Sequence, residues 1–239
     1  MDPVLLQINF LYFDIYINES MHSESRIYHP TGRTTTIKNE PRTKKMNGIG
    51  DIGIENTERA ELKVTVKVFV SSPEADTLKE ALNKVFENLN TDKIESLVIA
   101  YSTKDDSEDI LTSLKSLWRA VEEYVKIGKL SSVGLSDLNT NTFIELFQWA
   151  NIKPDIVQIN LATCCVVPPA LQEFSKANDV QLLTHSDPSE ILPEDVLKEI
   201  FGLPVSLHWV VKYQIHLKCR GILTSKGYLI YIKKLLTRN

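Results

Sequence analysis

The chain has 239 residues, of which 43% are hydrophobic and 24% are charged, and its formal net charge is −4. These values are ordinary for a globular protein, and the acidic balance gives no electrostatic argument for binding nucleic acid or an anionic membrane. Three cysteines, with no Cys-x-x-Cys pair and no His/Cys pair at zinc spacing, predict neither a disulfide framework nor a metal site.

The first sixty residues differ in composition from the rest of the chain. Residues 4–17 are apolar and aromatic, but the stretch is too short and too polar to span a bilayer, and an acidic residue precedes it where a secretory signal would be basic. Residues 22–56 are rich in Ser, Thr, Asn, Gly, Lys and Arg, so they bury too little apolar surface to offset the entropy of ordering. We therefore expect residues 1–60 to be irregular or poorly ordered, and the protein to be cytoplasmic and not attached to a membrane.

From residue 62 onward, strand and helix patterns alternate. Apolar runs of strand length are typical of parallel strands covered on both faces, and Pro168 or Pro169 is placed to start a helix. Strands are predicted at 62–70, 94–101, 130–135, 155–161 and 180–184, and helices at 76–89, 107–129, 140–149, 170–177 and 189–201. This alternation predicts βαβ units and a parallel sheet, which could be doubly wound or closed into a barrel.

The last forty residues have a weaker pattern. Residues 208–213 are predicted as the end of a helix, and a last strand is predicted at 215–217 or 222–223. The apolar and basic run 228–238 is predicted as a helix, and packing on the body of the protein or contact with a partner is favoured over a position on a membrane surface. Basic residues near its end suit a helix C-terminus because the helix dipole favours positive charge there.

Four blocks of sequence resemble, in order and spacing, the aldo-keto reductases, which are (β/α)₈ barrels. The blocks are VTVKVF at 64–69, VGLSDL at 133–138, IKPDIVQIN at 152–160 and KC at 218–219. The resemblance implies an α/β fold of the TIM-barrel type over residues 61–239. The early barrel segment of that family is shortened here, which predicts a barrel incomplete at its N-terminus.

Further blocks resemble one group within that superfamily, the regulatory (modifier) subunits of glutamate–cysteine ligase. They are VQINLATCCVVPP at 157–169, QLLTHSDP at 181–188 and SKGY at 225–228. The resemblance implies a protein without catalytic activity that forms a heterodimer with the catalytic subunit of the ligase in glutathione biosynthesis. In that role it would improve the use of glutamate and ATP and relieve feedback inhibition by glutathione.

The cysteines have two interpretations. Neighbouring residues of a strand point to opposite sides, so Cys164 and Cys165 are not expected to bond to each other. Each of them is either a small core hydrophobe or an accessible thiol. Because the resemblance implies an intersubunit disulfide, Cys164, Cys165 and Cys219 are all candidates for it, and the sequence does not rank them.

The alternative function is an NADPH-dependent aldo-keto reductase. That reaction needs a tyrosine acid supported by lysine, aspartate and histidine, and the resemblance places Lys67 at the lysine position. Ala100 stands where the histidine is expected, and the tyrosine and aspartate would come from the shortened segment. Loss of the acid lowers the rate by ~10²–10⁴-fold. A working reductase is therefore not the reading we favour.

The resemblance also marks a vestigial cofactor site. Ser136, Asp137 and Gln158 match positions that bind the nicotinamide amide, and Lys218 matches a lysine that contacts phosphate. Asp137 replaces the usual asparagine, which removes an amide donor and adds a negative charge. We expect no cofactor to be required, with NADPH binding as the alternative.

Overall fold

The computed structural model describes residues 4–9, 25–28, 34–37, 58–103, 109–160, 166–188, 190–201 and 205–234. The strands are β1 (Val4–Asn9), β2 (Ser25–Tyr28), β3 (Thr34–Ile37), β4 (Leu62–Val70), β5 (Ile94–Tyr101), β6 (Leu130–Ser136), β7 (Ile156–Asn160), β8 (Gln181–His185), β9 (Val205–Leu217) and β10 (Ile222–Lys234). The helices are α1 (Ala75–Asn88), α2 (Ile110–Lys126), α3 (Thr140–Trp149), α4 (Pro169–Ala177) and α5 (Glu194–Phe201).

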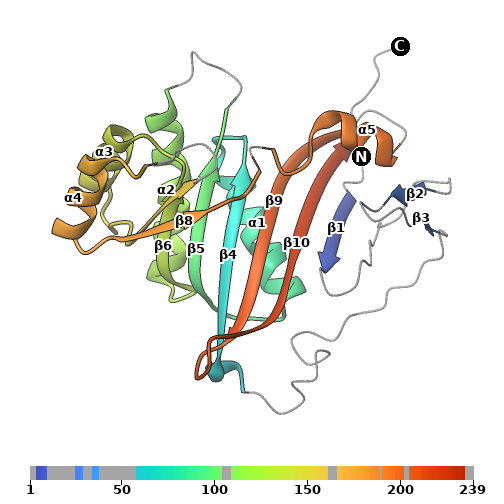
Figure 1. The fold of residues 1–239 in the computed structure, drawn as a ribbon, viewed down its shortest axis with the longest axis horizontal. Helices are drawn as coiled ribbons and strands as arrows, with labels where there is room; N and C mark the ends of the chain where they lie inside the picture. The colour runs from blue at the N-terminus through green and yellow to red at the C-terminus, as the bar shows by residue number, and fades with distance from the viewer. Residues whose placement is uncertain are drawn as a thin grey trace.

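One sheet of eight strands forms the body, in the order β1-β10-β9-β4-β5-β6-β7-β8 (Figure 1). Strands β4 to β8 are parallel to one another, and a helix follows each of them. Strands β9, β10 and β1 continue the sheet beyond β4, each antiparallel to its neighbour. The predicted α/β class with parallel β/α units is confirmed. Within the described chain the sheet has β1 and β8 as its edges, as expected of an incomplete barrel.

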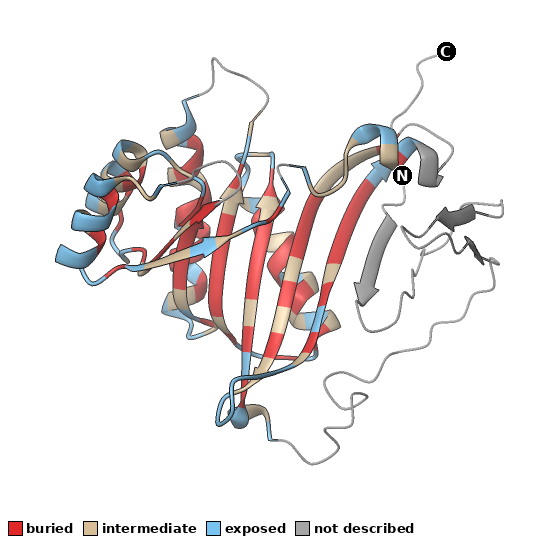
Figure 2. Cartoon of the chain, in the orientation of Figure 1, coloured by how far each residue is buried: buried red, intermediate tan, exposed pale blue. Residues whose placement is uncertain are grey.

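The two faces of the sheet differ. On one face the alternate residues Val64, Val66 and Val68 of β4 are fully buried. They belong to a core with apolar side chains of α1 and α2, such as Leu82 and Leu117. Figure 2 shows this buried layer running through the middle strands. We call the opposite face the inner face.

The inner face is covered from two directions. At one end, Leu197 of α5 packs with Val210 of β9 and Ile230 of β10 in a second apolar cluster. In the middle, β8 crosses in front of β5 and β4 in Figure 1. The parallel part of the sheet therefore curls until its last strand lies over its first, and the residues that end β8 come to face β4 and β9.

Helix ends follow the local sequence. The side chain of Asn139 caps α3 by accepting a hydrogen bond from the backbone N–H of Thr142 at 2.8 Å. Pro169 is the first residue of α4, as predicted. Gly128 lies just beyond α2 with φ +77°, a left-handed conformation in which glycine carries no side-chain strain.

The helix predictions for residues 208–213 and 228–238 are wrong, because both stretches lie mainly in the long strands β9 and β10. In β9, Trp209, Val211 and Tyr213 are buried at every second position, which is the period of a strand. In β10, Leu229 and Ile230 point to opposite faces and both are buried. Because both faces are buried, the sequence lacks the apolar–polar alternation of a half-exposed strand, and such an apolar run is equally compatible with a helix.

The N-terminal segment contributes more structure than we expected. Its strand β1 pairs with β10 and forms one edge of the main sheet, and β2 pairs with β3 in a separate sheet. The division of the chain at residue 60 stays a prediction.

A substitution at Gly134 tests how closely β6 and β7 approach each other. A Cβ atom there would lie 2.2 Å from the carbonyl oxygen of Ile156, so Gly134→Ala should force the two strands apart. We expect a loss of about 3 kcal/mol in the free energy of unfolding, measured by urea denaturation. Gly128→Ala is the control: it meets open space and should lose only ~1–2 kcal/mol from its left-handed backbone. Equal losses would contradict the close contact.

Candidate functional site

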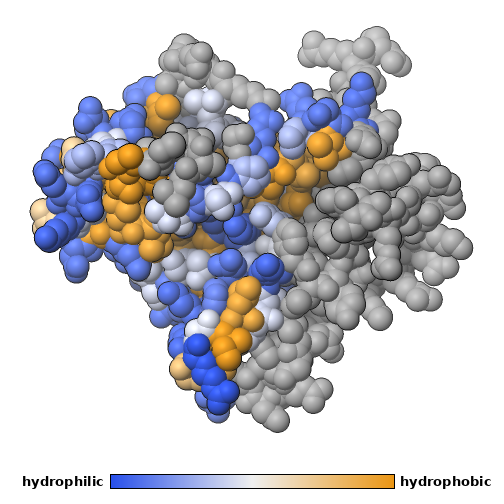
Figure 3. Space-filling view, viewed as in Figure 1, coloured by the Kyte–Doolittle hydropathy of each residue, from blue (hydrophilic) through white to orange (hydrophobic). Residues whose placement is uncertain are grey.

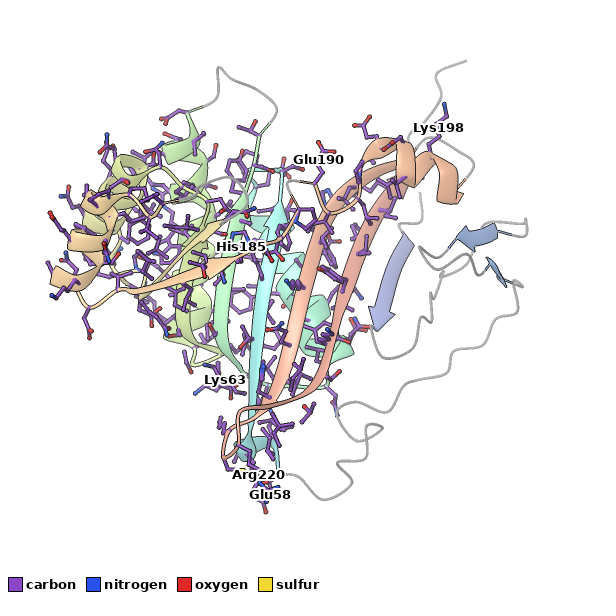
Figure 4. The ribbon with its side chains drawn as sticks, viewed as in Figure 1. Glu58, Lys63, His185, Glu190, Lys198 and Arg220 are labelled. Carbon is purple, nitrogen blue, oxygen red and sulfur yellow. The ribbon has the colours of Figure 1, made fainter. Side chains whose placement is uncertain are left out.

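Charged and polar side chains gather on the inner face, where β8 crosses the sheet. Figure 4 shows His185, the last residue of β8, in front of the central strands. We call the group the Lys67 cluster. It consists of Lys67 on β4, Ser136 and Asp137 at the end of β6, His185 and Asp187 at and after the end of β8, and Lys212 on β9.

Asp187 lies between two lysines. Lys67 and Lys212 are directly opposite each other on the antiparallel strands β4 and β9, where two like charges are destabilising. One carboxylate oxygen of Asp187, Oδ2, lies 2.9 Å from Lys67 Nζ, and the other, Oδ1, accepts a hydrogen bond from Lys212. The side chains of Lys67 and Asp187 are 7% and 5% exposed, so water screens the pair weakly. Removal of one member of such a buried pair typically costs ~3–5 kcal/mol.

In Lys67 and in Asp187, burial and ion pairing shift the pKa in opposite directions. Burial lowers the pKa of the Lys67 amine below its ordinary value, although Asp187 and Asp137 act against the shift. Burial alone would raise the pKa of Asp187, but hydrogen bonds from Lys212 and Lys67 outweigh it and the pKa is lowered. The Asp187 carboxylate is therefore held in its charged form.

His185 joins the ends of two strands, β6 and β8. Its Nε2 atom lies 2.9 Å from Asp137 Oδ1 and 3.1 Å from Ser136 Oγ, and its Nδ1 atom lies 3.0 Å from Asp187 Oδ2. Both ring nitrogens therefore face hydrogen-bonding partners, which fixes the imidazole in position. It also ties the end of β8 to the end of β6.

The contacts from Ser136 through His185 to Asp187 resemble those of a catalytic triad, in which a base lies between a nucleophile and an orienting carboxylate. The hydroxyl of Ser136 does not face a substrate, however, because the residue is 1% exposed. Its Oγ also donates to Asp137 Oδ2 at 2.7 Å, which competes with His185 for the proton. The arrangement stabilises the strand ends and does not present an activated hydroxyl.

Asp137 connects the cluster to β7. Its backbone has φ +63°, a left-handed conformation that aspartate adopts more readily than most residues. In this conformation its N–H donates to the carbonyl of Gln158 at 2.9 Å, and its Oδ1 accepts from the N–H of Asn160 at 2.9 Å. The side-chain oxygen Oε1 of Gln158 is buried without a hydrogen-bond partner among the described residues.

The structure brings together most of the predicted vestigial site but not all of it. Lys67, Ser136 and Asp137 are in contact through His185, and Gln158 adjoins them on β7. Lys218 lies at the other end of the sheet, where its Nζ donates to the carbonyl of Ala60 at 2.8 Å. It follows that Lys218 does not share a site with the other four residues.

The structure describes one of the three candidate cysteines. Cys219 is exposed in the turn that follows β9 and has a free thiol. Cys164 and Cys165 lie outside the described residues.

Three members of the cluster, His185, Asp187 and Lys212, were missed from the sequence. The position of Asp187 directly after a parallel strand was a usable signal, because such strand ends meet at one edge of a sheet. Lys212 was hidden by the incorrect helix at 208–213.

The nicotinamide of a dinucleotide cofactor does not fit this arrangement of side chains. The hydroxyl of Ser136 and the carboxylate of Asp137, which would receive its amide, are both engaged by His185. Asp137 also presents a carboxylate in place of an amide donor. The unpaired oxygen of Gln158 is the single feature that suits an amide ligand.

The described residues contain no group of three or more His, Cys, Asp or Glu side chains placed to hold a metal ion. In the same part of the chain, no helix is both long enough and apolar enough to cross a bilayer.

Comparisons with known proteins agree on one family. The family model described as "Aldo/keto reductase family" matches residues 45–187. The human glutamate–cysteine ligase regulatory subunit is 36% identical over 191 residues, which cover 76% of this chain and 70% of the relative. A putative glutamate–cysteine ligase regulatory subunit of Schizosaccharomyces pombe is 27% identical, with 71% of each chain covered.

Enzymes are matched over shorter lengths. The glyoxal reductase of Bacillus subtilis is 29% identical, and the match covers 66% of this chain and 55% of the enzyme. Among solved structures, an aldo-keto reductase from a deep-sea metagenome library matches with 26% identity and a TM-score of 0.45. That match covers 53% of this chain and 44% of the other chain, so this chain spans less than half of that enzyme.

The lowered pKa of Asp187 predicts a pH dependence of stability. As the pH falls below about 4, the unfolded chain binds the Asp187 proton first, so the stability contributed by the carboxylate is lost. We expect Asp187→Asn to be less stable than the wild type at pH 7 and to lose less of its free energy of unfolding between pH 5 and pH 3. Urea unfolding at several pH values measures both.

The matched control is Asp179→Asn, on an exposed turn where the left-handed backbone (φ +55°) suits asparagine. It should follow the wild-type pH curve. If the curve of Asp187→Asn runs parallel to that of the wild type, Asp187 does not carry the acid sensitivity.

Proposed function

The chain belongs to the aldo/keto reductase family and, within it, to the glutamate–cysteine ligase regulatory subunits, and we propose that it is a non-catalytic regulator of that ligase. The proposed partner is the catalytic subunit, in a heterodimer that acts in glutathione biosynthesis. The proposed location is the cytoplasm. Similarity to named regulatory subunits over most of both chains is the observation that carries the proposal.

The chemistry of the Lys67 cluster supports a non-catalytic role. In a reductase of this family the lysine has to support a tyrosine acid next to the carbonyl of a substrate. Here the Lys67 amine is paired with Asp187 and lies 3.3 Å from His185 Nε2. Ala100, at the position where the family's histidine is expected, has no group that donates a proton. The groups that remain are used to hold strands together.

The regulation itself is a coupling between binding events. A partner protein changes substrate affinity only if it binds one state of the enzyme more tightly than another. We propose that this chain prefers the state of the catalytic subunit that binds glutamate and ATP well and glutathione poorly. No cofactor is needed for this role.

We propose Cys219 as one candidate for a disulfide with the catalytic subunit. Its turn lies at the tip of the β9–β10 hairpin, near the labelled Arg220 in Figure 4. The neighbouring side chains Ile222 and Leu223 are 49% and 41% exposed, and Figure 3 shows apolar surface at this tip. An exposed thiol beside apolar side chains suits a protein contact. Cys164 and Cys165 remain the other candidates.

The regulatory role is tested by mixing the purified full chain with the catalytic subunit. We expect a complex on size-exclusion chromatography and a rise of about 5- to 150-fold in the glutathione concentration that half-inhibits the ligase, the usual range of allosteric coupling. Heat-denatured chain is the control and should have no effect. The absence of both a complex and a change in inhibition would falsify the regulatory role.

The same preparation tests the reductase alternative. The proposal predicts no NADPH consumption with aldehydes. Consumption that disappears in Lys67→Met would overturn the non-catalytic interpretation and favour a reductase.

The disulfide is tested on non-reducing gels of the complex. We expect a cross-linked band that is lost when Cys164, Cys165 and Cys219 are all changed to serine. Comparison of Cys219→Ser with the Cys164→Ser/Cys165→Ser double variant then assigns the thiol. A band that survives the triple change shows that none of the three forms the bridge.

A further inference from the structure

The pairing of strands β4 and β9 brings the two lysines of the Lys67 cluster together, and the Asp187 carboxylate is not needed for this. Lys67 and Lys212 are paired across β4 and β9, and their side chains are 7% and 31% exposed. The carboxylate between them comes from elsewhere. Asp187 follows β8, which stands four places from β4 in the order of the sheet. The two lysines thus lie on strands of the main sheet, whereas the carboxylate between them lies on the loop that follows β8.

We propose that Lys67 and Lys212 form a binding site for a small carboxylate, which Asp187 fills from within the chain. The site takes a free carboxylate when the side chain of Asp187 is absent or withdrawn.

The contacts match a carboxylate in shape and in charge. Each oxygen of Asp187 pairs with a different lysine, so both ends of a planar anion are recognised. The backbone N–H of Asp187 donates to His185 Nδ1 at 3.2 Å, so this imidazole nitrogen anchors the loop and the two lysines recognise the carboxylate. The two ammonium groups exclude a cation. The site is also partly enclosed, which strengthens its attraction for an anion relative to exposed surface lysines.

The loop is held independently of this carboxylate. Asn160 Nδ2 donates to the backbone carbonyl of Asp187 at 2.8 Å, and that bond does not involve the Asp187 side chain. Truncation of the side chain to alanine therefore leaves the backbone anchored and opens a space beside both lysines. In the wild type, the tethered carboxylate acts at an effective concentration of the millimolar range or higher, so dilute free anions do not displace it.

The test is chemical rescue in the full chain. Asp187→Ala should unfold at a lower temperature than the wild type, because two buried or half-buried lysines lose their shared anion. Sodium formate should raise its melting temperature in a saturable way, by roughly 2–4 °C for each kcal/mol of linked binding. Sodium chloride at the same ionic strength should have a smaller effect. The wild type, with its site filled, should not respond to formate beyond its response to chloride.

Two control variants separate a site from general salt stabilisation. Asp155 is a part-buried carboxylate that accepts from Ser132 Oγ at 2.5 Å and from the N–H of Val133 at 2.6 Å, and it ion-pairs with no lysine in the described part of the chain. Asp155→Ala should be destabilised without a specific response to formate. The double variant Asp187→Ala/Lys212→Met should lose most of the response, because half of the site is gone.

Three results would overturn the carboxylate site. They are equal stabilisation of Asp187→Ala by chloride and formate, an equal formate response in Asp155→Ala, and a full response in the double variant. If Asp187→Ala does not fold in buffer, its refolding yield is measured against formate concentration. A yield that rises with formate but not with chloride supports the site, and a yield that does not respond excludes it. The site is independent of the proposed regulatory role, so either one can fail alone.

Discussion

The curled parallel sheet places one carboxylate between two lysines. Lys67 and Lys212 face each other on β4 and β9, and the repulsion between them is relieved by Asp187 from beyond β8. Asp187 reaches both lysines because the last parallel strand, β8, lies over the first, β4. Burial makes the tie strong, because loss of one member of a buried pair costs ~3–5 kcal/mol. Together with the contacts of Asn160 and His185, this tie holds the end of β8 over the inner face.

The same tie supports the proposal that this reductase-type scaffold has a non-catalytic role. Strand ends of a parallel β/α sheet gather polar side chains whatever the function of the protein. In this chain Lys67, Ser136 and Asp137 keep that position, but each is bonded to another residue of the cluster. Their partners are His185, which contacts Ser136 and Asp137, and Asp187, which pairs with Lys67. The polar groups at these strand ends are thus hydrogen-bonded or ion-paired to one another.

Much of the fold was predictable from the sequence, and the failures have physical causes. The five β/α units were found because their strands are short apolar runs and their helices have clear apolar stripes. The helices predicted at 208–213 and 228–238 were wrong, although the strand predicted at 215–217 or 222–223 falls in β9 or β10. The cause is that β9 and β10 are buried on both faces over much of their length, which hides the period of a strand. Lys67, Ser136 and Asp137 were found by family resemblance. Lys212 and Asp187 were not, because their importance lies in contacts across strands far apart in sequence.

The pairing of β4 with β9 has a consequence for how the chain folds during synthesis. Strand β4 ends at Val70, but its antiparallel neighbour begins only at Val205. While the ribosome makes the residues between them, one edge of β4 presents unpaired backbone groups to solvent, and such an edge attracts other strands. The nascent chain is thus exposed to aggregation until its final hairpin emerges, so a truncation before residue 205 should be an insoluble product and not a smaller domain.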